Sequence, residues 1–339
     1  MPSARTDSES WKRMVLRAMP PPAWLGVDAP SSDVVLSSRA RYMRNVRGFR
    51  FPNTASTEEL VEVERLIVHA NKESGLNLEP FRQISNAERE YLVGCRLVSP
   101  DYEWSEPGRS VLIDGPRSLS LMVNEEDHLR VQALTAGWSI DAADATARSC
   151  VKALGKHVEF AESPIYGWLS ASPFNAGKGR RLSAMLHLIG LAQAKRLPVV
   201  LSALTSKGIT ARGLFGESSR AVGAFLQVSL VNGDQSEFAG AVEYLVSAER
   251  EARLLIGRET IEVRARQAVE FACASTTLPL SDALRVIGWI RWAAAASIEG
   301  FPQSARSVDL MLTSLELRGD SQTMAAARSR ADFLRQALD

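Results

Sequence analysis

The distribution of strand-like and helix-like segments divides this chain near residue 260. Before that point, short runs of alternating or β-branched apolar residues are interspersed with segments of helical periodicity. From Thr260 to Asp339 the periodic segments, at 281–301 and 324–338, have helical spacing, and no strand candidate follows. We therefore expect an α+β protein with an N-terminal extension and linker at 1–33, a mixed domain at 34–260 and a helical C-terminal domain at 261–339.

Caps, turns and residue spacing locate individual elements of the mixed domain. Ser56 and Glu59 form a capping-box pattern, which predicts that a helix begins there. A turn at 114–116 separates two predicted strands, and the second strand ends in the acidic cluster 124–127. Further strands are expected at 167–172, 197–204 and 224–232, and helices at 180–196 and 236–255.

Composition excludes several classes of protein. Lys and Arg number 40 and Asp and Glu 39, so the net charge of +1 gives no reason to expect nucleic acid or an acidic membrane as partner. Three widely spaced cysteines, Cys95, Cys150 and Cys273, follow no pattern of a disulfide framework or a zinc site. No apolar run has the length of a signal peptide core or the roughly 20 residues of a membrane span. We expect a soluble, cytoplasmic protein.

Arginine is concentrated in the segment "LSSRARYMRNVRGFR". If its first part is a strand, Arg39 and Arg41 point to the same side, where two guanidinium groups can bind a polyphosphate through paired hydrogen bonds. A solvated basic edge is the alternative, because arginine is common on protein surfaces.

The segment "NEEDHLR" places acids beside an arginine directly after a predicted strand. Glu125, Glu126 and Asp127 could bind a cation, hold Mg²⁺ through water, or pair with Arg130. His128 is expected to be structural, because no second histidine lies at metal-ligand spacing.

Two further segments contain glycine and arginine. Arg212 and Glu217 flank the glycine-containing loop 213–216, which predicts either a close approach of backbone to ligand or a plain hairpin turn. The segment "GWLSASPFNAGKGRRLSAML" matches neither a Walker loop nor a dinucleotide-binding loop. Arg180 and Arg181 are expected to begin a helix there, whose N-terminus would favour phosphate.

Taken in order, four segments resemble the guanidino kinases, in particular the bacterial protein arginine kinases. They are "VVLSSRARYMRN", "MVNEEDHLRVQ", "YGWLSASPFNAGKGRRLSAMLHL" and "RGLFGESSRAVGAFLQVS", and the resemblance extends through 34–260. It implies a glutamine-synthetase-like catalytic domain with an antiparallel sheet flanked by helices. Relatives that act on free arginine or creatine carry a helical N-terminal domain, whereas only residues 1–33 precede the core here, which favours protein substrates.

The resemblance also implies roles for individual residues. The arginines around the nucleotide phosphates would be Arg39, Arg41, Arg130, Arg181 and Arg212, with Ser37, Ser38 and Ser183 beside them. Glu126 and Glu217 would hold the substrate guanidinium, with Glu126 as the base. ATP would bring Mg²⁺, held through its phosphates and water, with Glu125 as a possible contributor; no dedicated metal site is implied.

Three positions depart from the family pattern near the site. Ser172 stands where the family has cysteine, and a hydroxyl cannot supply the negative charge of a thiolate. The neighbouring Phe174 also departs from the pattern, whereas Pro173 and Asn175 keep it. Arg96 replaces a histidine that stacks near adenine, a position in which arginine can also stack. A slower kinase or an inactive one is expected.

The last helical segment, "RADFLRQAL", resembles a phosphoarginine-binding motif of these kinases. Asp332 and Arg335 fit the motif, whereas Ala331 and Gln336 do not, and an ordinary solvated helix is the alternative. The resemblance further implies a homodimer formed by the C-terminal helices, a zinc-binding activator and a Clp-type unfoldase as partners.

The sequence therefore predicts an ATP-dependent kinase that phosphorylates arginine side chains of proteins. One alternative is a pseudokinase that binds nucleotide or phosphoarginine without transfer, because of Ser172. The other alternative is a kinase for a free guanidino compound.

Overall fold

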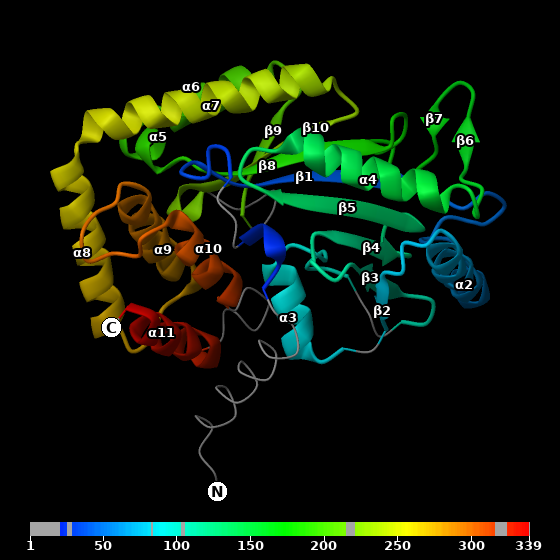
Figure 1. Ribbon diagram of the computed structural model, residues 1–339, viewed down its shortest axis with the longest axis horizontal. Helices are drawn as coiled ribbons and strands as arrows, with labels where there is room; N and C mark the ends of the chain where they lie inside the picture. Colours follow the sequence, from blue (N-terminus) through cyan, green and yellow to red (C-terminus); the bar gives the residue numbers. More distant parts are fainter. Residues whose placement is uncertain are drawn as a thin grey trace, which may run out of the picture.

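The fold is built around one antiparallel sheet with helices on both faces (Figure 1). The computed structural model describes residues 21–25, 29–82, 84–102, 106–214, 221–315 and 324–338. The sheet order is β2-β3-β4-β5-β1-β8-β10-β9, so β1 lies between β5 and β8. Its strands are β1 (Val35–Arg44), β2 (Glu79–Phe81), β3 (Ser110–Ile113), β4 (Leu119–Val123), β5 (Leu129–Ala136), β8 (Arg180–His187), β9 (Thr210–Gly213) and β10 (Phe225–Val231).

The helices and a small hairpin complete the described chain. The hairpin consists of β6 (Glu162–Ser163) and β7 (Gly167–Trp168) and lies at the end of the molecule opposite α8 (Figure 1). The helices are η1 (Ala23–Leu25), α2 (Thr57–Glu73), α3 (Asn86–Gly94), α4 (Ile140–Leu154), α5 (Ile189–Gln193), α6 (Leu197–Thr205), η2 (Val222–Ala224), α7 (Gln235–Ile256), α8 (Arg258–Ala274), α9 (Leu280–Ala295), α10 (Ala305–Ser314) and α11 (Met324–Leu338).

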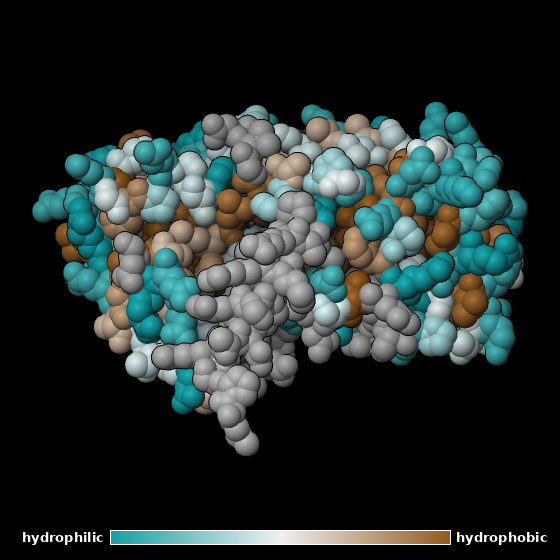
Figure 2. Space-filling model, turned by 60° about the horizontal axis from the view of Figure 1, so that its bottom comes forward, coloured by the Kyte–Doolittle hydropathy of each residue, from teal (hydrophilic) through white to brown (hydrophobic). Residues whose placement is uncertain are grey.

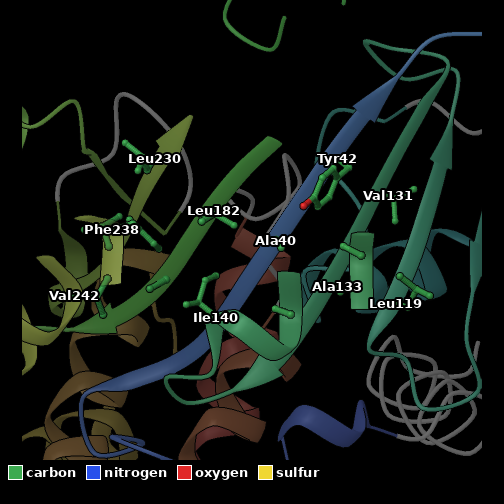
Figure 3. Close-up of a cluster of buried hydrophobic side chains, with 14 of the residues drawn as sticks. Ala40, Tyr42, Leu119, Val131, Ala133, Ile140, Leu182, Leu230, Phe238 and Val242 are labelled. Atoms are coloured by element: carbon green, nitrogen blue, oxygen red, sulfur yellow. The ribbon is translucent and has the colours of Figure 1, made fainter. Parts of the chain in front are cut away.

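One face of the sheet carries the main hydrophobic core. Ala40 of β1 and Leu182 of β8 point to this face, where Ile140 of α4 and Phe238 of α7 pack in the same cluster (Figure 3). Side chains alternate between faces along a strand, so the neighbours of Ala40 and Leu182 in sequence point to the opposite face. Burial of this apolar layer fixes the register of β1 and β8, and in that register Arg39, Arg41 and Arg181 point away from the core.

The opposite face is covered by two groups of helices, which touch each other through α3 and α10. At one end, η1 and α3 pack in a cluster with Met122 and Leu134. At the other end, the C-terminal helices α9, α10 and α11 pack against Met185 and Phe225. The part of this face between the two covers contains the cavity described below.

Several predicted elements are confirmed. Helix α2 begins with the full capping box of Ser56 and Glu59, and β3 and β4 pair across the predicted turn. Helices α7 and α11 occupy the predicted ranges. The described residues after 260 contain helices and no strand.

Two predicted elements are wrong. The segment 180–187 is strand β8 rather than a helix, so Arg180 and Arg181 lie on a strand and offer no helix N-terminus to a phosphate. The segment 197–205 is helix α6 rather than a strand. Of the predicted strand 167–172, only the two residues of β7 form a strand.

The described surface is mixed in character. Figure 2 shows hydrophilic residues at both ends of the molecule and apolar residues in small patches between them. Within the described ranges, no helix combines the length and the apolar character that crossing a bilayer requires.

Candidate functional site

Five arginines converge on the face of the sheet opposite the main core. They come from four strands: Arg39 and Arg41 from β1, Arg130 from β5, Arg181 from β8 and Arg212 from β9. Arg41 and Arg181 occupy directly opposed positions of β1 and β8. Like charges that face each other across a sheet are destabilising. A bound anion would offset this repulsion.

A cavity of about 340 Å³ separates these arginines from the helices above them. Arg39, Arg41, Arg181 and Arg212 line it from the sheet. Val93 and Gly94 of α3 and Leu312 of α10 form its other walls. The two helices meet closely, because a Cβ at position 94 would lie 2.5 Å from the carbonyl oxygen of Thr313. Only glycine permits this contact, which brings the two walls together beside the cavity.

Arg39 and Arg41 lie close to other positive charges. Burial, together with the charges of Arg96, Arg181 and Arg130, lowers the pKa of Arg39 to about 9. Burial and neighbouring arginines also lower the pKa of Arg41 far below its ordinary value. Nε and Nη2 of Arg41 are buried and have no hydrogen-bond partner among the described residues. Such unsatisfied buried donors are rare in native proteins and indicate a ligand site.

Arg96 contributes a fifth guanidinium to the cavity. It follows α3 with a left-handed φ of 60°, a conformation that non-glycine residues rarely adopt. Its Nη1 donates to Oγ of Ser37 at 2.7 Å, and its guanidinium lies 5.7 Å from the ring of Trp24. Burial is the main cause that lowers the pKa of Arg96 to about 10.

The three predicted serines have different environments. Ser37 accepts the bond from Arg96, whereas the hydroxyl of Ser38 donates to the carbonyl of Gly137 at 2.8 Å and is engaged within the fold. Ser183 lies on the arginine face, where its hydroxyl is 3.0 Å from that of Ser229.

Two cavity residues escaped sequence reasoning. Gln227 of β10 accepts a 2.6 Å hydrogen bond from Nη2 of Arg39, and Gln132 of β5 donates to the carbonyl of Leu97. Both occupy strand positions that alternate with apolar residues, which is the signal that could have identified them.

The acidic cluster lies beside Arg130 at the end of β4 and β5. Nη2 of Arg130 is 2.6 Å from Glu125 and 3.6 Å from Glu126, and its Nη1 donates to Ser99, which lines the cavity. The side chain of Glu126 is 45% exposed, and it accepts a 3.1 Å bond from Asn175. Arg130 therefore joins the cavity to the carboxylates, and Glu126 is open to a second ligand.

Asp127 holds the loop that carries Ser172. The buried Asp127 carboxylate accepts hydrogen bonds from Asn45 at 2.7 Å, from the hydroxyl of Ser170 and from the backbone N–H of Ala171 at 2.8 Å. These bonds fix the loop between β7 and β8 next to the acidic cluster. Asn45, another residue that sequence reasoning missed, follows directly after β1 and links that strand to the loop.

His128 is structural, as predicted. Its Nδ1 accepts from the backbone N–H of Val46 at 3.0 Å, and its Nε2 lies 2.9 Å from the carbonyl of Arg50. Burial lowers the pKa of His128 below its ordinary value. His128 therefore links the segment that follows β1 to the start of β5.

The remaining predicted site residues divide into two groups. Ser172 lies in the Asp127-anchored loop and is half-buried, whereas Glu217 lies outside the described residues. Asp332 and Arg335 lie on α11, pair with each other at 3.0 Å, and line no part of the arginine cavity. Arg335 also donates to the carbonyls of Cys273 and Ser275 at the end of α8.

The donor set does not suit a protein-bound metal. Across the described ranges, no three His, Cys, Asp or Glu side chains are grouped to hold an ion. The carboxylate of Glu125 is bound by Arg130, and Asp101 lines the cavity.

Comparison with known proteins gives the same assignment for sequence and fold. Residues 58–236 match the ATP:guanido phosphotransferase C-terminal catalytic domain. Protein-arginine kinases of Halothermothrix orenii and Moorella thermoacetica are 34% and 33% identical over 281 and 292 residues. These alignments cover 79% and 81% of this chain and 80% and 83% of the relatives.

Two solved structures share the fold. A lombricine kinase has a TM-score of 0.58 at 20% identity, covering 73% of this chain and 78% of that enzyme. The duplicated taurocyamine kinase of Schistosoma mansoni has a TM-score of 0.57 at 21% identity, covering 71% of this chain and 38% of that enzyme. With the sequence match and the converging arginines, these likenesses lead to one conclusion: the chain belongs to the ATP:guanido phosphotransferase family.

Proposed function

We propose that this chain transfers the γ-phosphoryl group of ATP to arginine side chains of proteins. The observation that carries the proposal is the meeting of four arginines from three strands around one cavity, which Arg130 of a fourth strand connects to a pair of glutamates. The curated relatives named protein-arginine kinase support arginine in proteins as the acceptor. The sequence similarity to them extends beyond the catalytic core.

The cavity arginines would bind the triphosphate. Arg39, Arg41, Arg130, Arg181 and Arg212 provide positive charge in a partly desolvated site, where electrostatic stabilisation of a transferring phosphoryl group is strong. The lowered pKa values of Arg39 and Arg41 would return toward normal when the anion binds. Arg96 would lie against the nucleobase, held by Ser37, while Ser183 and Ser38 would support the strands beneath.

Glu126 would hold the substrate guanidinium and take its proton. The attacking guanidinium nitrogen forms a bond to the γ-phosphorus as the bond to the bridging β–γ oxygen breaks, and ADP leaves. A guanidinium is protonated at neutral pH, so one of its protons must pass to a base, and the half-exposed Glu126 carboxylate is available for it. Ser172 and Glu217 would complete the guanidinium site.

Mg²⁺ would arrive with the nucleotide. The described residues that fit such a complex are the arginines and Glu125, rather than a set of metal ligands. When bound, the ion neutralises charge on the phosphates. The direct contacts of the protein to the phosphates would come from the arginines.

The family resemblance is the support for further partners. We propose a homodimer formed by the helices after residue 260, a zinc-binding activator and a Clp-type unfoldase that recognises phosphoarginine. Asp332 and Arg335 would bind phosphoarginine only after their mutual ion pair is broken. This requirement predicts a weaker regulatory site than an unpaired arginine would provide.

The test is to incubate the protein with ATP, Mg²⁺ and casein and to measure acid-labile phosphate. A Ser172→Cys variant is expected to be faster by roughly tenfold or more, because a thiolate offers the guanidinium a charge-assisted contact that a hydroxyl cannot. Ser206→Cys, at the exposed end of α6, is the matched control. Activity only in Ser172→Cys would identify the parent as a pseudokinase, and turnover of free arginine alone would contradict the protein-substrate assignment.

A further inference from the structure

Three large apolar side chains stand exposed on two neighbouring loops, one of which reaches the proposed acceptor site through Asn175. Ile165, Tyr166 and Phe174 are 82%, 68% and 82% exposed. They lie on two loops, the turn of the β6–β7 hairpin and the loop between β7 and β8. We call these three residues the apolar rim. Exposed apolar groups gathered at a functional site are typical of recognition surfaces.

The two loops of the apolar rim are joined through their backbones. Trp168 and Gly177 exchange hydrogen bonds of 2.8 and 3.1 Å. A Cβ on Gly177 would lie 3.9 Å from the carbonyl oxygen of Tyr166. The side chain of Asn232 donates to the carbonyls of Phe174 and Ala176 at 3.3 and 2.6 Å. Both loops are thus held in place without support from the rim side chains.

The apolar rim is also tied to the proposed base. Asn175, the neighbour of Phe174 in sequence, donates to the carboxylate of Glu126 at 3.1 Å. The start of the same loop is held by Asp127, the neighbour of Glu126. A polypeptide whose arginine reaches Glu126 must therefore pass close to Phe174.

We propose that the apolar rim binds an apolar side chain that flanks the target arginine of a protein substrate. This inference rests on the proposed function and specifies the substrate class of that site. Free arginine has no group to fill the rim, and a second copy of this chain seated on it would obstruct the acceptor site.

The experiment compares two peptides that differ only beside their single arginine, one with flanking leucines and one with flanking glycines. Binding is measured by fluorescence anisotropy, and phosphorylation is measured as kcat/KM with ATP and Mg²⁺. The leucine peptide is expected to be favoured by about fivefold to tenfold in both measurements, since contact with apolar surface is retained from the bound state onward. In Phe174→Ser and Ile165→Ser the preference is expected to fall toward one.

Leu254→Ser is the matched control, because Leu254 is 84% exposed on α7 and lies outside both loops. An unchanged preference in both rim variants would overturn the inference. The inference would also be overturned if Phe174→Ser lost self-association in gel filtration while the peptide preference stayed intact, because the rim would then bind a second copy of this chain. A binding preference that depends on Phe174, without phosphorylation of either peptide or of casein, would support the rim and reject the kinase function.

Discussion

The arginines that line the cavity are partly buried and Arg291, which binds the chain just before β1, is fully buried, yet their partners differ. Arg291 of α9 binds Asp309 at 2.7 Å and donates to the backbone carbonyls of Ser32 and Asp33 at 2.9 Å each. All three of its nitrogen atoms therefore have partners. Arg41 leaves Nε and Nη2 without partners among the described residues, and its nearest charges are mostly other arginines.

This difference separates an arginine that holds the fold from one that awaits a ligand. A buried charge is tolerated when hydrogen bonds and an opposite charge compensate for its lost hydration. The Arg291 cluster meets this condition within the protein. Arg41 does not meet it with its partners among the described residues, and a bound anion would supply the missing compensation, so Arg41 and Arg291 should respond in opposite ways to substitution.

The largest effect is expected for Arg41→Gln. Phosphoryl transfer should fall by about a thousandfold or more, the range typical of an arginine that stabilises a transferring phosphoryl group. Without nucleotide, the free energy of unfolding should not fall, because the substitution removes a poorly solvated charge that faces Arg181. Urea denaturation and the acid-labile phosphate assay measure the two quantities. Arg65→Gln, on the exposed surface of α2, is the control. An Arg41→Gln activity within tenfold of wild type would contradict the comparison.

Asp309→Ala should have the reverse profile. It leaves the charge of Arg291 buried and unpaired, which should reduce the free energy of unfolding by about 3–5 kcal/mol. Urea denaturation measures the loss. Asp282→Ala, which removes the partner of the exposed Arg285, is the control and should change stability little. A loss as small as that of the control would show that the Arg291 cluster does not hold the fold.

Nucleotide should stabilise the wild-type protein through the cavity arginines. At a concentration of ATP one hundred times Kd, the free energy of unfolding should rise by about 2.7 kcal/mol. The same ATP concentration should have little effect on Arg41→Gln, because the binding site is weakened. Thermal unfolding with and without ATP measures both. Equal stabilisation of the two proteins would place the nucleotide elsewhere.

The smallest effect is expected for an exposed arginine pair. Arg50 donates to Glu59 at 2.6 Å and lowers the pKa of Glu59 from 4.5 to about 2, with help from the backbone N–H of Ser56. A lowered carboxyl pKa stabilises the fold above pH 4.5, and this contribution is lost as the pH falls toward 2. Glu59→Gln should therefore be less stable than wild type at pH 7, with a difference that shrinks in acid. A difference that stays constant with pH, in urea denaturation, would contradict the assignment.

The sequence predicted elements where a local signal was sufficient. The capping box of α2 and the turn between β3 and β4 need no distant partner. Strand β8 was misread because its alternation of Leu182, Ala184 and Leu186 runs directly into helix α5, so the whole segment has the length of a helix. Its strand form depends on pairing with β1 and β10, which no local pattern reveals. Helix α6 was misread because Val199 and Val200 favour strands, whereas Pro198 sits at the start of a helix.

For the candidate site, the sequence predicted the residue types, and the structure shows which of them lie close together. Arg39 and Arg41 on one side of a strand follow from alternation alone. That Arg181 faces Arg41 depends on the register of two strands 140 residues apart. Arg96 with its bond to Ser37, and Gln227 with its bond to Arg39, depend on helix packing and strand order that a single sequence does not encode locally.

The fastening of β1 also has a consequence for synthesis on the ribosome. The carbonyls at its start are bound by Arg291 and Arg306, which follow 258 and 270 residues later. At 5–20 residues per second, the strand waits roughly 15 to 50 seconds after it is made before these side chains emerge. During that interval β1, which carries Arg39 and Arg41, lacks its hydrogen bonds from Arg291 and Arg306. A chain released before residue 309 never forms the Arg291–Asp309 pair.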